Sequence, residues 1–351
     1  MRGGRFLFAH KCGYIWHKAK TVIKDKIILI IGGSGSIGRE LVRQVLALKP
    51  AQVRVLSRDE SKQHDLLHEL GHPDNLRLFI GDIRDKERLS FACKGVDVIF
   101  HAAALKHVPS CEYNPFEAVR TNITGSQNVI DVAIANNVGR VLAISTDKVV
   151  DPVGVMGTTK LMMEKLIINA NYYRGDTPTN FSCVRFGNVA WARGSVLPLW
   201  KNQAEKRGAI TVTNSEMSRF MMSIQDAVRL VIESGNIMRG GEIFILKMPS
   251  ITLGQLAKEF IAKYYKRKKI AVKIVGDRIG EKMHEGLIGS GDGKVLESAK
   301  MFISIPNVWE YTGDKAAAKR KRDYAGFTKR KGDGHYMSSE HIDVAAVRKI
   351  L

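Results

Sequence analysis

The sequence predicts an α/β fold, in which a Rossmann-type, doubly wound parallel sheet carries a smaller C-terminal lobe that we expect to bind substrate. Strand-like apolar segments alternate with helical segments through about the first 190 residues, as expected when crossovers join parallel strands. The first segment, residues 26–31, is almost continuously apolar, which is typical of a strand buried on both faces. A glycine-rich turn follows it and leads directly into an amphipathic helix.

Hydrophobic periodicity predicts the further elements in chain order. We expect strands at residues 26–31, 53–57, 76–80, 96–102, 141–145 and 182–186, and helices at 36–48, 59–70, 85–93, 115–136 and 155–170. The alternation weakens beyond about residue 190, although we expect 226–233 and 242–246 to return to the first domain. We therefore divide the chain into a basic N-terminal extension (1–25), a Rossmann domain (26–190, with a return near 222–246), and a lobe with its tail (191–351).

Charge is the most unusual bulk property, because the chain of 351 residues has a formal net charge of +20. The basic residues gather in the first 26 residues, in 263–269 and in 315–331. Such runs are usually solvated surface, and the alternative that we retain is peripheral contact with an anionic membrane. No helix-turn-helix, zinc-finger or RNA-binding pattern accompanies them, so we expect no nucleic-acid partner.

Membrane and export signals are not evident in the sequence. No apolar run approaches the ~18 residues that span a bilayer, and the N-terminal segment lacks the pattern of a signal peptide. The four cysteines are scattered without a CxxC pair, as in a reduced cytosolic protein. These features predict a cytoplasmic protein, peripheral to the membrane if the basic runs bind lipid.

Three glycines predict a phosphate-binding turn. Gly32, Gly35 and Gly38 form GxxGxxG between the first strand and the first helix, where Ser36 and Ile37 begin the helix. Glycine lets the backbone approach a pyrophosphate, and the N-terminus of the helix offers unpaired N–H groups and a positive dipole end. The alternative is a glycine-rich structural turn without a ligand.

The end of the second strand favours NADP over NAD. The strand ends at Ser57-Arg58, and a guanidinium suits a 2′-phosphate, whereas a carboxylate would hold ribose hydroxyls. Asp59 follows, so NAD stays open. Asp82 after the third strand is placed to bind an adenine amino group, or else to cap the next helix. The predicted cofactor site also includes Ile83, Ala102, Ala103, Ala104, Lys106, Asn122 and Lys160.

A set of longer motifs carries a family resemblance. IGGSGSIG, GDIRD, HAAALKHVP, NPFEAVRTNITGSQNVI and ISTDKVVDP occur in order, followed by VRFGNVAWARGSVLP, MSRFMMS, GEIFILKMPS and RIGEKMHEGLI. Together they resemble the inverting UDP-N-acetylglucosamine 4,6-dehydratases and related CapD-type polysaccharide-biosynthesis enzymes, which are extended short-chain dehydrogenases/reductases. The resemblance covers roughly residues 26–288, and YMSS at 336–339 resembles a tail element of the family.

The resemblance implies a reaction and a catalytic pair. Hydride leaves carbon 4 of the sugar for NADP, water is eliminated across carbons 5 and 6, and the hydride returns to carbon 6, with inversion at carbon 5. Asp147 and Lys148 would be the acid/base pair of the elimination, which needs one group to take the carbon 5 proton and one to protonate the hydroxyl. The family further implies a homo-oligomer and a role in surface polysaccharide or glycan biosynthesis.

The chain departs from the superfamily at one catalytic position. Short-chain dehydrogenases carry YxxxK, and here the matching residues are Met156 and Lys160. Met156 cannot exchange a proton. A Met-substituted branch of the family exists, in which the proton would pass through Thr146, Asp147, Lys148, Lys160 or a bound water. The other interpretation is a protein that binds NADP or a nucleotide sugar without turnover.

The substrate would lie against residues from several motifs. Lys106 and His107 follow the fourth strand, at the edge where such sheets bind ligands, although His107 could equally be a buried imidazole. Arg278 suits a diphosphate and Glu281 suits ribose hydroxyls, whereas Arg219 is either a phosphate ligand or a partner of Glu216. The remaining predicted contacts are Asn188, Arg193 and Ser195.

No His, Cys or carboxylate cluster has the spacing of metal ligands, so we expect no metal. A UDP-sugar 4-epimerase is the alternative enzyme, and it would normally need the missing Tyr.

Overall fold

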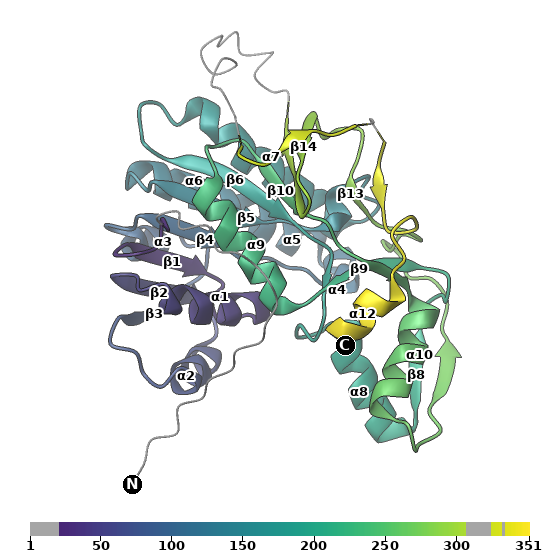
Figure 1. Ribbon diagram of the computed structural model, residues 1–351. Coiled ribbons are helices and arrows are strands. Elements are labelled where there is room, and N and C mark those ends of the chain that lie inside the picture. The colour runs from purple at the N-terminus through teal and green to yellow at the C-terminus, as the bar shows by residue number, and fades with distance from the viewer. Residues whose placement is uncertain (1–20, 307–323, 332–333) are drawn as a thin grey trace.

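A ten-stranded sheet forms the centre of the protein in a computed structural model that describes residues 21–306, 324–331 and 334–351. Its strand order is β16-β14-β15-β10-β6-β5-β4-β1-β2-β3, and the strands from β10 to β3 run parallel. Helices α1 and α9 pack together on one face, and α3, α6 and α7 pack on the other (Figure 1). The doubly wound parallel sheet predicted from the sequence is therefore confirmed.

The strands of the first half lie where the apolar runs predicted them, within two residues at each end. The strand at 76–80 matches its prediction at both ends, and the strand at 96–102 is shorter than predicted. The bounds are β1 Ile27–Ile31, β2 Gln52–Ser57, β3 Leu76–Ile80, β4 Val98–His101, β5 Arg140–Ile144 and β6 Asn180–Arg185.

The helices agree with the periodicity except between residues 108 and 135. The helix predicted over 115–136 consists of α5 (Pro115–Ala118), a π-helical turn (Val119–Thr124) and α6 (Gly125–Ala135), and α4 (Val108–Tyr113) precedes it. A proline stands in the first turn of both α4 and α5, where its missing N–H is tolerated. The other helices are α1 Ser36–Ala47, α2 Glu60–Glu69, α3 Lys86–Cys93 and α7 Val155–Tyr173.

The main sheet takes in more of the C-terminal half than our division of the chain assigned to it. After α9 (Ile224–Ile237), β10 (Ile243–Leu246) pairs in parallel with β6. Beyond it, β15 (Met301–Ile305) pairs antiparallel with β10, followed by β14 (Lys294–Glu297) and β16 (Thr328–Lys329). β15 joins the sheet because its sequence, MFISI, is largely apolar, and it is buried almost throughout.

The lobe lies beside the carboxyl edge of the sheet, at the lower right of Figure 1. Its own core surrounds the buried side chains of Trp200 and Phe260. Its elements are β7 Asn188–Val189, α8 Val196–Arg207, β8 Ala209–Val212, β9 Ser218–Met222, β11 Ser250–Thr252, α10 Leu253–Tyr264, β12 Ala271–Ile274 and α12 Val344–Ile350. The short pair β13 Gly286–Ile288 and β17 Tyr336–Met337 packs instead against the core of the main sheet.

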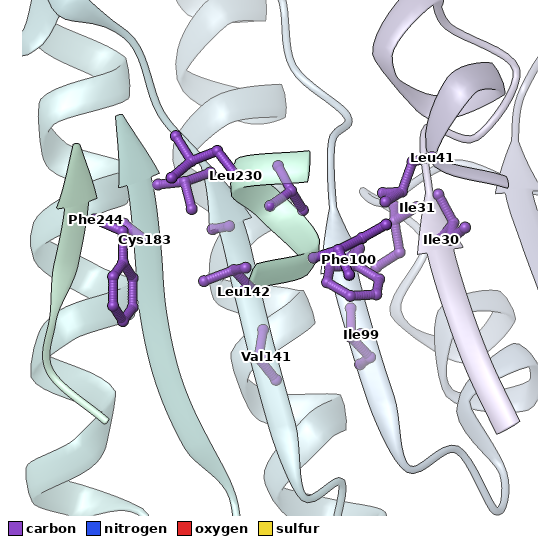
Figure 2. Packing of buried hydrophobic residues seen from close by; sticks show 14 of the residues in the cluster. Ile30, Ile31, Leu41, Ile99, Phe100, Val141, Leu142, Cys183, Leu230 and Phe244 are labelled. Carbon is purple, nitrogen blue, oxygen red and sulfur yellow. The ribbon is translucent and has the colours of Figure 1, made fainter. Parts of the chain in front are cut away.

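The sheet is held by apolar packing on both faces. Figure 2 shows the side chains of Ile30, Phe100, Leu142 and Leu230 gathered between the strands and a covering helix. All four are essentially excluded from solvent. Each such side chain stabilises the fold by roughly 1.5–3 kcal/mol through its transfer from water. Much of the predicted basic surface, namely residues 1–20 and 315–323, lies outside the described residues.

A buried ion cluster joins the sheet to the segment that follows β13. Arg185, at the end of β6, contacts the carboxylate of Glu164 on α7 and lies 2.7 Å from Asp292 Oδ2. Arg185 also donates to the carbonyl of Leu287, and Asp292 accepts from the backbone N–H of Gly289. All three charged side chains are at most 7% exposed. A buried charge without its partner is costly, so the cluster locks this segment to the sheet.

We expect Asp292→Asn to destabilise the fold by about 3 kcal/mol, because it removes one carboxylate from a buried guanidinium. Urea unfolding of the whole chain measures this. Glu297→Gln is the matched control, since Glu297 pairs with Lys247 at a partly exposed site, where such a pair contributes at most about 1 kcal/mol. An equal loss in both variants would contradict the importance of the buried cluster.

Candidate active site

A cleft of about 720 Å³ runs along the carboxyl ends of the parallel strands. Ligands bind at this edge in open α/β sheets, because the connecting loops and the N-termini of the helices meet there. The cleft continues from the glycine turn to the loop that enters the lobe. Of the residues predicted from the sequence, it is lined by Gly32, Gly35, Ser36, Ile37, Gly38, Arg58, Asp82, Ile83, Ala102, Ala103, Ala104, Lys106, His107, Thr146, Lys148, Met156, Lys160, Asn188, Arg193 and Ser195.

The glycine turn at one end of the cleft is tightly packed against backbone. A Cβ on Gly38 would lie 2.3 Å from the carbonyl oxygen of Gly32, so only glycine fits there. Gly32 has φ +82°, and a Cβ on it would lie 2.7 Å from the backbone nitrogen of Ala103. The N-cap of α1, Gly35, provides no side-chain cap, so the first N–H groups of the helix have no side-chain acceptor. The arrangement fits a diphosphate.

Several charged side chains of both signs follow the carboxyl ends of β2 and β3. The guanidinium of Arg58 is largely exposed, and its Nη1 lies 3.7 Å from Asp82 Oδ2. Asp59 caps α2 by accepting from the backbone N–H of Lys62. Asp85, rather than Asp82, caps α3, so the helix-cap alternative for Asp82 is wrong. Asp82 instead accepts from the side chain and backbone of Arg84.

Asn122 lies behind the cleft and does not line it. Its side-chain amide bonds both backbone groups of Leu105, at 2.8 Å to the N–H and 3.0 Å to the carbonyl, and it also donates to Thr159. Both the amide oxygen and the amide nitrogen of Asn122 are therefore engaged, and the side chain is only 1% exposed. In this structure Asn122 therefore fixes the loop that carries Ala102–Leu105, and any influence on a cofactor would act through that loop.

Asp147 and Lys148 form a short 3₁₀ turn, Asp147–Val149, directly after β5. The turn brings both side chains together, with Lys148 Nζ 2.9 Å from Asp147 Oδ1. Lys148 lines the cleft, whereas Asp147 is fully buried behind it and accepts from Thr146 as well. Asp147 Oδ2 is buried without a hydrogen-bond partner. A Cβ on Gly187, which lines the cleft, would lie 3.0 Å from that oxygen.

Burial and charge shift the pKa values of this pair. Burial raises the pKa of Asp147, and the neighbouring Lys148 offsets this only in part. Burial alone would lower the pKa of Lys148, but the carboxylates of Asp147 and Glu285 outweigh it, so the pKa is raised. The ammonium form of Lys148 is therefore favoured in the site.

The sequence reasoning did not assign a role to Glu285 or Lys282. Glu285 Oε1 lies 3.4 Å from Lys148 Nζ, and its Oε2 lies 3.2 Å from Lys282 Nζ. Glu285 is 1% exposed. Both residues belong to the GEKMHE motif, in which we singled out only Glu281. The motif itself was the available signal, but its spacing does not reveal contact with Lys148.

Lys160 and Met156 occupy the first turns of α7. Lys160 Nζ donates to the carbonyl of Ile144 at 2.5 Å and lies 3.2 Å from the sulfur of Met163. Burial lowers the pKa of Lys160 to about 8. Met156, 3% exposed, packs in an apolar cluster with Val108, Cys111 and Ala118. The wall that would carry the Tyr hydroxyl is therefore apolar here.

The loop that enters the lobe contacts the glycine turn. The backbone N–H of Arg193 donates to Ser36 Oγ at 2.8 Å, and Lys106 Nζ donates to the Arg193 carbonyl at 3.0 Å. His107 is exposed rather than buried, and its ring would collide with a Cβ on Gly194, at 2.3 Å. The buried-imidazole alternative for His107 is therefore wrong.

Arg219, Arg278 and Glu281 gather beside the cleft and do not line it. Arg219 is buried and donates to the carbonyl of Ser218 at 2.8 Å. Its nearest carboxylate is Glu281, at 4.0 Å, and Glu281 also lies 3.7 Å from Arg278. The pairing of Arg219 with Glu216 that we considered is thus replaced by one with Glu281. In the described part of the chain, no three His, Cys or carboxylate side chains gather as metal ligands.

Several known proteins align with most of this chain. The chain is 52% identical over 289 residues to an uncharacterized membrane protein of Methanocaldococcus jannaschii, covering 81% of this chain and 86% of that protein. It is 43% identical to an inverting UDP-N-acetylglucosamine 4,6-dehydratase of Campylobacter jejuni, covering 81% and 84%. It is also 41% identical to a UDP-glucose 4-epimerase of Rickettsia canadensis, covering 80% and 83%.

Solved structures agree on the fold. Pen from Bacillus thuringiensis superposes with a TM-score of 0.86 at 42% identity, covering 94% of this chain and 98% of that one. The dTDP-glucose 4,6-dehydratase DesIV of Streptomyces venezuelae, solved with NAD, has a TM-score of 0.67 at 23% identity, covering 73% and 86%. The model of the family described as polysaccharide biosynthesis protein matches residues 28–306. The chain therefore belongs to the polysaccharide biosynthesis protein family, among the nucleotide-sugar dehydratases and epimerases of the extended short-chain dehydrogenase/reductase superfamily.

Proposed function

We propose that this protein is an NADP-dependent 4,6-dehydratase that acts on UDP-N-acetylglucosamine and inverts carbon 5, in surface polysaccharide or glycan biosynthesis. The observation that carries the proposal is the Asp147–Lys148 turn, which presents Lys148 to the same cleft that contains the glycine turn. An epimerase needs no such pair, because it eliminates no water. The 43% identity to a dehydratase of that name also supports the choice.

The cofactor would lie along the part of the cleft nearest β1 and β2. When bound, NADP would supply reversible hydride transfer at carbon 4 and carbon 6 of the sugar. The N–H groups at the start of α1, from Ser36 onward, would bind its diphosphate, and Arg58 would bind the 2′-phosphate. Asp82 and Ile83 would lie beside the adenine, while Ala102, Ala103 and Ala104 would line the opposite wall.

Elimination requires two proton transfers, which Asp147 and Lys148 would share. One group takes the carbon 5 proton and the other protonates the departing hydroxyl at carbon 6, so the protons balance. The 2.9 Å contact between the two groups would let the proton pass back within the pair, which would return a proton to carbon 5 when hydride reaches carbon 6. The proton taken earlier from the carbon 4 hydroxyl would replace it, so the protons balance over the cycle. Thr146, which donates to Asp147, would orient that carboxylate.

Lys160 would take the place of the missing Tyr in exchanging the proton of the carbon 4 hydroxyl. Lys160 is among the residues that line the cleft, and its pKa of about 8 leaves a large uncharged fraction at mildly alkaline pH. Met156 would form the apolar wall beside it. The intact lysines and Asp147 argue against the non-catalytic alternative, in which the protein binds NADP or a UDP-sugar without turnover.

The nucleotide sugar would extend from the catalytic turn toward the lobe. Asn188, whose Oδ1 lies 3.4 Å from Lys148 Nζ, and Ser195 would face the sugar. The side chains of Lys106, His107 and Arg193 would bind the diphosphate. We retain Arg278 for the diphosphate of the UDP portion, Glu281 for its ribose hydroxyls and Arg219 as a second phosphate ligand. These contacts require the segment around Arg278 to move toward the cleft.

Incubation with UDP-N-acetylglucosamine and NADP tests the proposed function. We expect the sugar nucleotide to lose one water, seen by mass spectrometry, and to gain a methyl doublet in the proton NMR spectrum. Lys148→Met should reduce kcat by about 10²–10⁴-fold, the usual contribution of a general acid or base.

Other outcomes identify the alternatives. An unchanged mass with altered ring couplings would mean a 4-epimerase. Bound NADP and UDP-sugar with no product from any UDP-hexose would mean a binding protein.

Arg58→Ala tests the choice of NADP over NAD. We expect NADP affinity to fall about 10- to 100-fold with NAD affinity unchanged, because only the 2′-phosphate loses a charge-assisted bond. Calorimetric titration of both cofactors measures this. The control is Arg84→Ala, which removes a neighbouring guanidinium that binds Asp82 and Glu117 and does not line the cleft. Equal losses for both cofactors would contradict the role of Arg58.

Peripheral binding to anionic membranes is the second part of the proposal. Lys266, Arg267, Lys268 and Lys269 are exposed in the lobe between α10 and β12. No helix among the described residues is long and apolar enough to cross a membrane. We retain a cytoplasmic location and a homo-oligomer, for which the exposed apolar side chains of α4, α5 and α7 offer a surface: Tyr113, Phe116, Met162 and Tyr173.

We expect the protein to cosediment with phosphatidylserine vesicles at low salt. Replacing Lys266, Lys268 and Lys269 with Ala should weaken this about 100-fold, since each surface charge contributes roughly 1 kcal/mol. Replacing three exposed lysines of the other domain should change it little: Lys49, Lys86 and Lys94. Equal weakening in both triple variants would mean that net charge, not this segment, attracts the vesicles.

A further inference from the structure

We propose that Glu285 is a positioning residue for Lys148, and that the C-terminal tail holds Glu285 in place through Ser338. Glu285 would keep the ammonium of Lys148 at the wall of the cleft and set its charge. The inference deepens the proposed dehydratase function and rests on it for its consequence in catalysis. The contact between Glu285 and Lys148 can be tested without turnover.

Lys148 lies between two buried carboxylates. Asp147 contacts it at 2.9 Å from its own turn, and Glu285 contacts it at 3.4 Å from the segment that leads into β13. Asp147 and Glu285 are 0% and 1% exposed, and Lys148 is 22% exposed. The amine therefore has its counter-charges on the buried side and its open side toward the cleft.

The two carboxylates differ in how readily they take a proton. Burial raises the pKa of Asp147. Burial would also raise the pKa of Glu285, but Lys148, Arg219 and Lys282 outweigh it and lower the pKa. The ionised form is therefore favoured for Glu285, whereas the protonated form of Asp147 is more accessible than in water. A fixed negative charge beside Lys148 lets the amine keep its position when the charge of Asp147 changes.

The described charged groups around Lys148 come from several elements. Asp147 and Glu285 are the anions, and Arg219 on β9 and Lys282 are the cations. The positive charge of Arg219 lowers the pKa of Lys148 in part. Lys282 pairs with Glu285 Oε2, the oxygen that does not face Lys148. Lys282 also donates to the carbonyl of Val150, just past the catalytic turn. Removing Glu285 would leave Asp147 as the carboxylate that contacts Lys148, while Glu281 lies 4.0 Å from Arg219, so Lys148 would lose its proton more easily.

The tail fixes Glu285 through its backbone. The N–H of Glu285 donates to Ser338 Oγ at 2.9 Å, and the N–H of Ser338 donates to the Glu285 carbonyl at 2.8 Å. Ser338 Oγ also lies 2.7 Å from the hydroxyl of Ser218, and its carbonyl accepts from Ser250 Oγ at 2.5 Å. Ser338 is fully buried. The YMSS element thus joins β9, β11 and the segment carrying Glu285.

The first experiment measures the protonation of Lys148 in the full-length protein. Competitive acetylation over a range of pH, followed by mass spectrometry of the Lys148 peptide, gives the pH of half-labelling. We expect Glu285→Gln to lower that pH by about 1–3 units, the usual effect of an opposite charge at this distance. Glu297→Gln, the same chemical change beside Lys247, should leave it unchanged. No shift in Glu285→Gln would overturn the proposal.

The second experiment measures turnover and distinguishes positioning from a structural role. We expect Glu285→Gln to lower kcat about 100-fold with little change in KM, since misplacement of a catalytic group by about 1 Å has this effect. The limb of the kcat–pH profile that Lys148 controls should move to lower pH. Lower kcat with an unmoved limb and unmoved labelling would mean a structural role and overturn the proposal.

Two further variants keep the test decisive. Glu285→Asp restores the charge and should recover most of the shift in the labelling pH. Ser338→Ala leaves Glu285 in place but loosens it, so the labelling pH of Lys148 and kcat should fall by smaller amounts. If Glu285→Gln fails to fold, Ser338→Ala becomes the deciding variant. An unchanged labelling pH and kcat in Ser338→Ala would then overturn the proposal. If the unaltered protein dehydrates no sugar nucleotide while the labelling shift is present, the proposed function fails and the contact stands.

Discussion

A charged amine that is largely removed from water needs counter-charges, and the two halves of the chain each supply one to Lys148. Asp147 comes from the same turn, whereas Glu285 comes from the far end of the chain and is tied down by Ser338. Without both carboxylates, the desolvation of Lys148 would favour its neutral form. The charge state of the site therefore depends on segments that never line the cleft.

The parallel sheet explains why such distant segments meet. Its carboxyl edge gathers the turn after β1, the loop after β4 and the turn after β5 into one cleft. The lobe then closes this edge, because the backbone of Arg193 bonds Ser36 and Lys106 bonds Arg193 in turn. A cofactor on the glycine turn and a sugar at Lys148 would thus share one continuous space.

Local sequence patterns predicted the first half well. The apolar runs of β1 and β3 and the period of α1 depend on near neighbours, and each lies where it was expected. Contacts between distant segments were not predictable in this way. The pairing of β15 with β10, the Glu285–Lys148 contact and the choice of Glu281 over Glu216 by Arg219 follow from the fold, not from spacing. Asn122 was recognised as a site residue from its motif, although its bonds hold a loop.

Met156 stands where the resemblance to short-chain dehydrogenases leads us to expect a Tyr, so this position offers no hydroxyl. Met156 joins the apolar side chains of Val108 and Cys111, which makes the surroundings less polar. Burial lowers the pKa of Lys160, to about 8. An amine that is partly uncharged near neutral pH can accept a proton, which an ammonium cannot. In the proposed mechanism, Lys160, one helical turn from Met156, would therefore exchange the proton that a Tyr hydroxyl exchanges elsewhere in the superfamily.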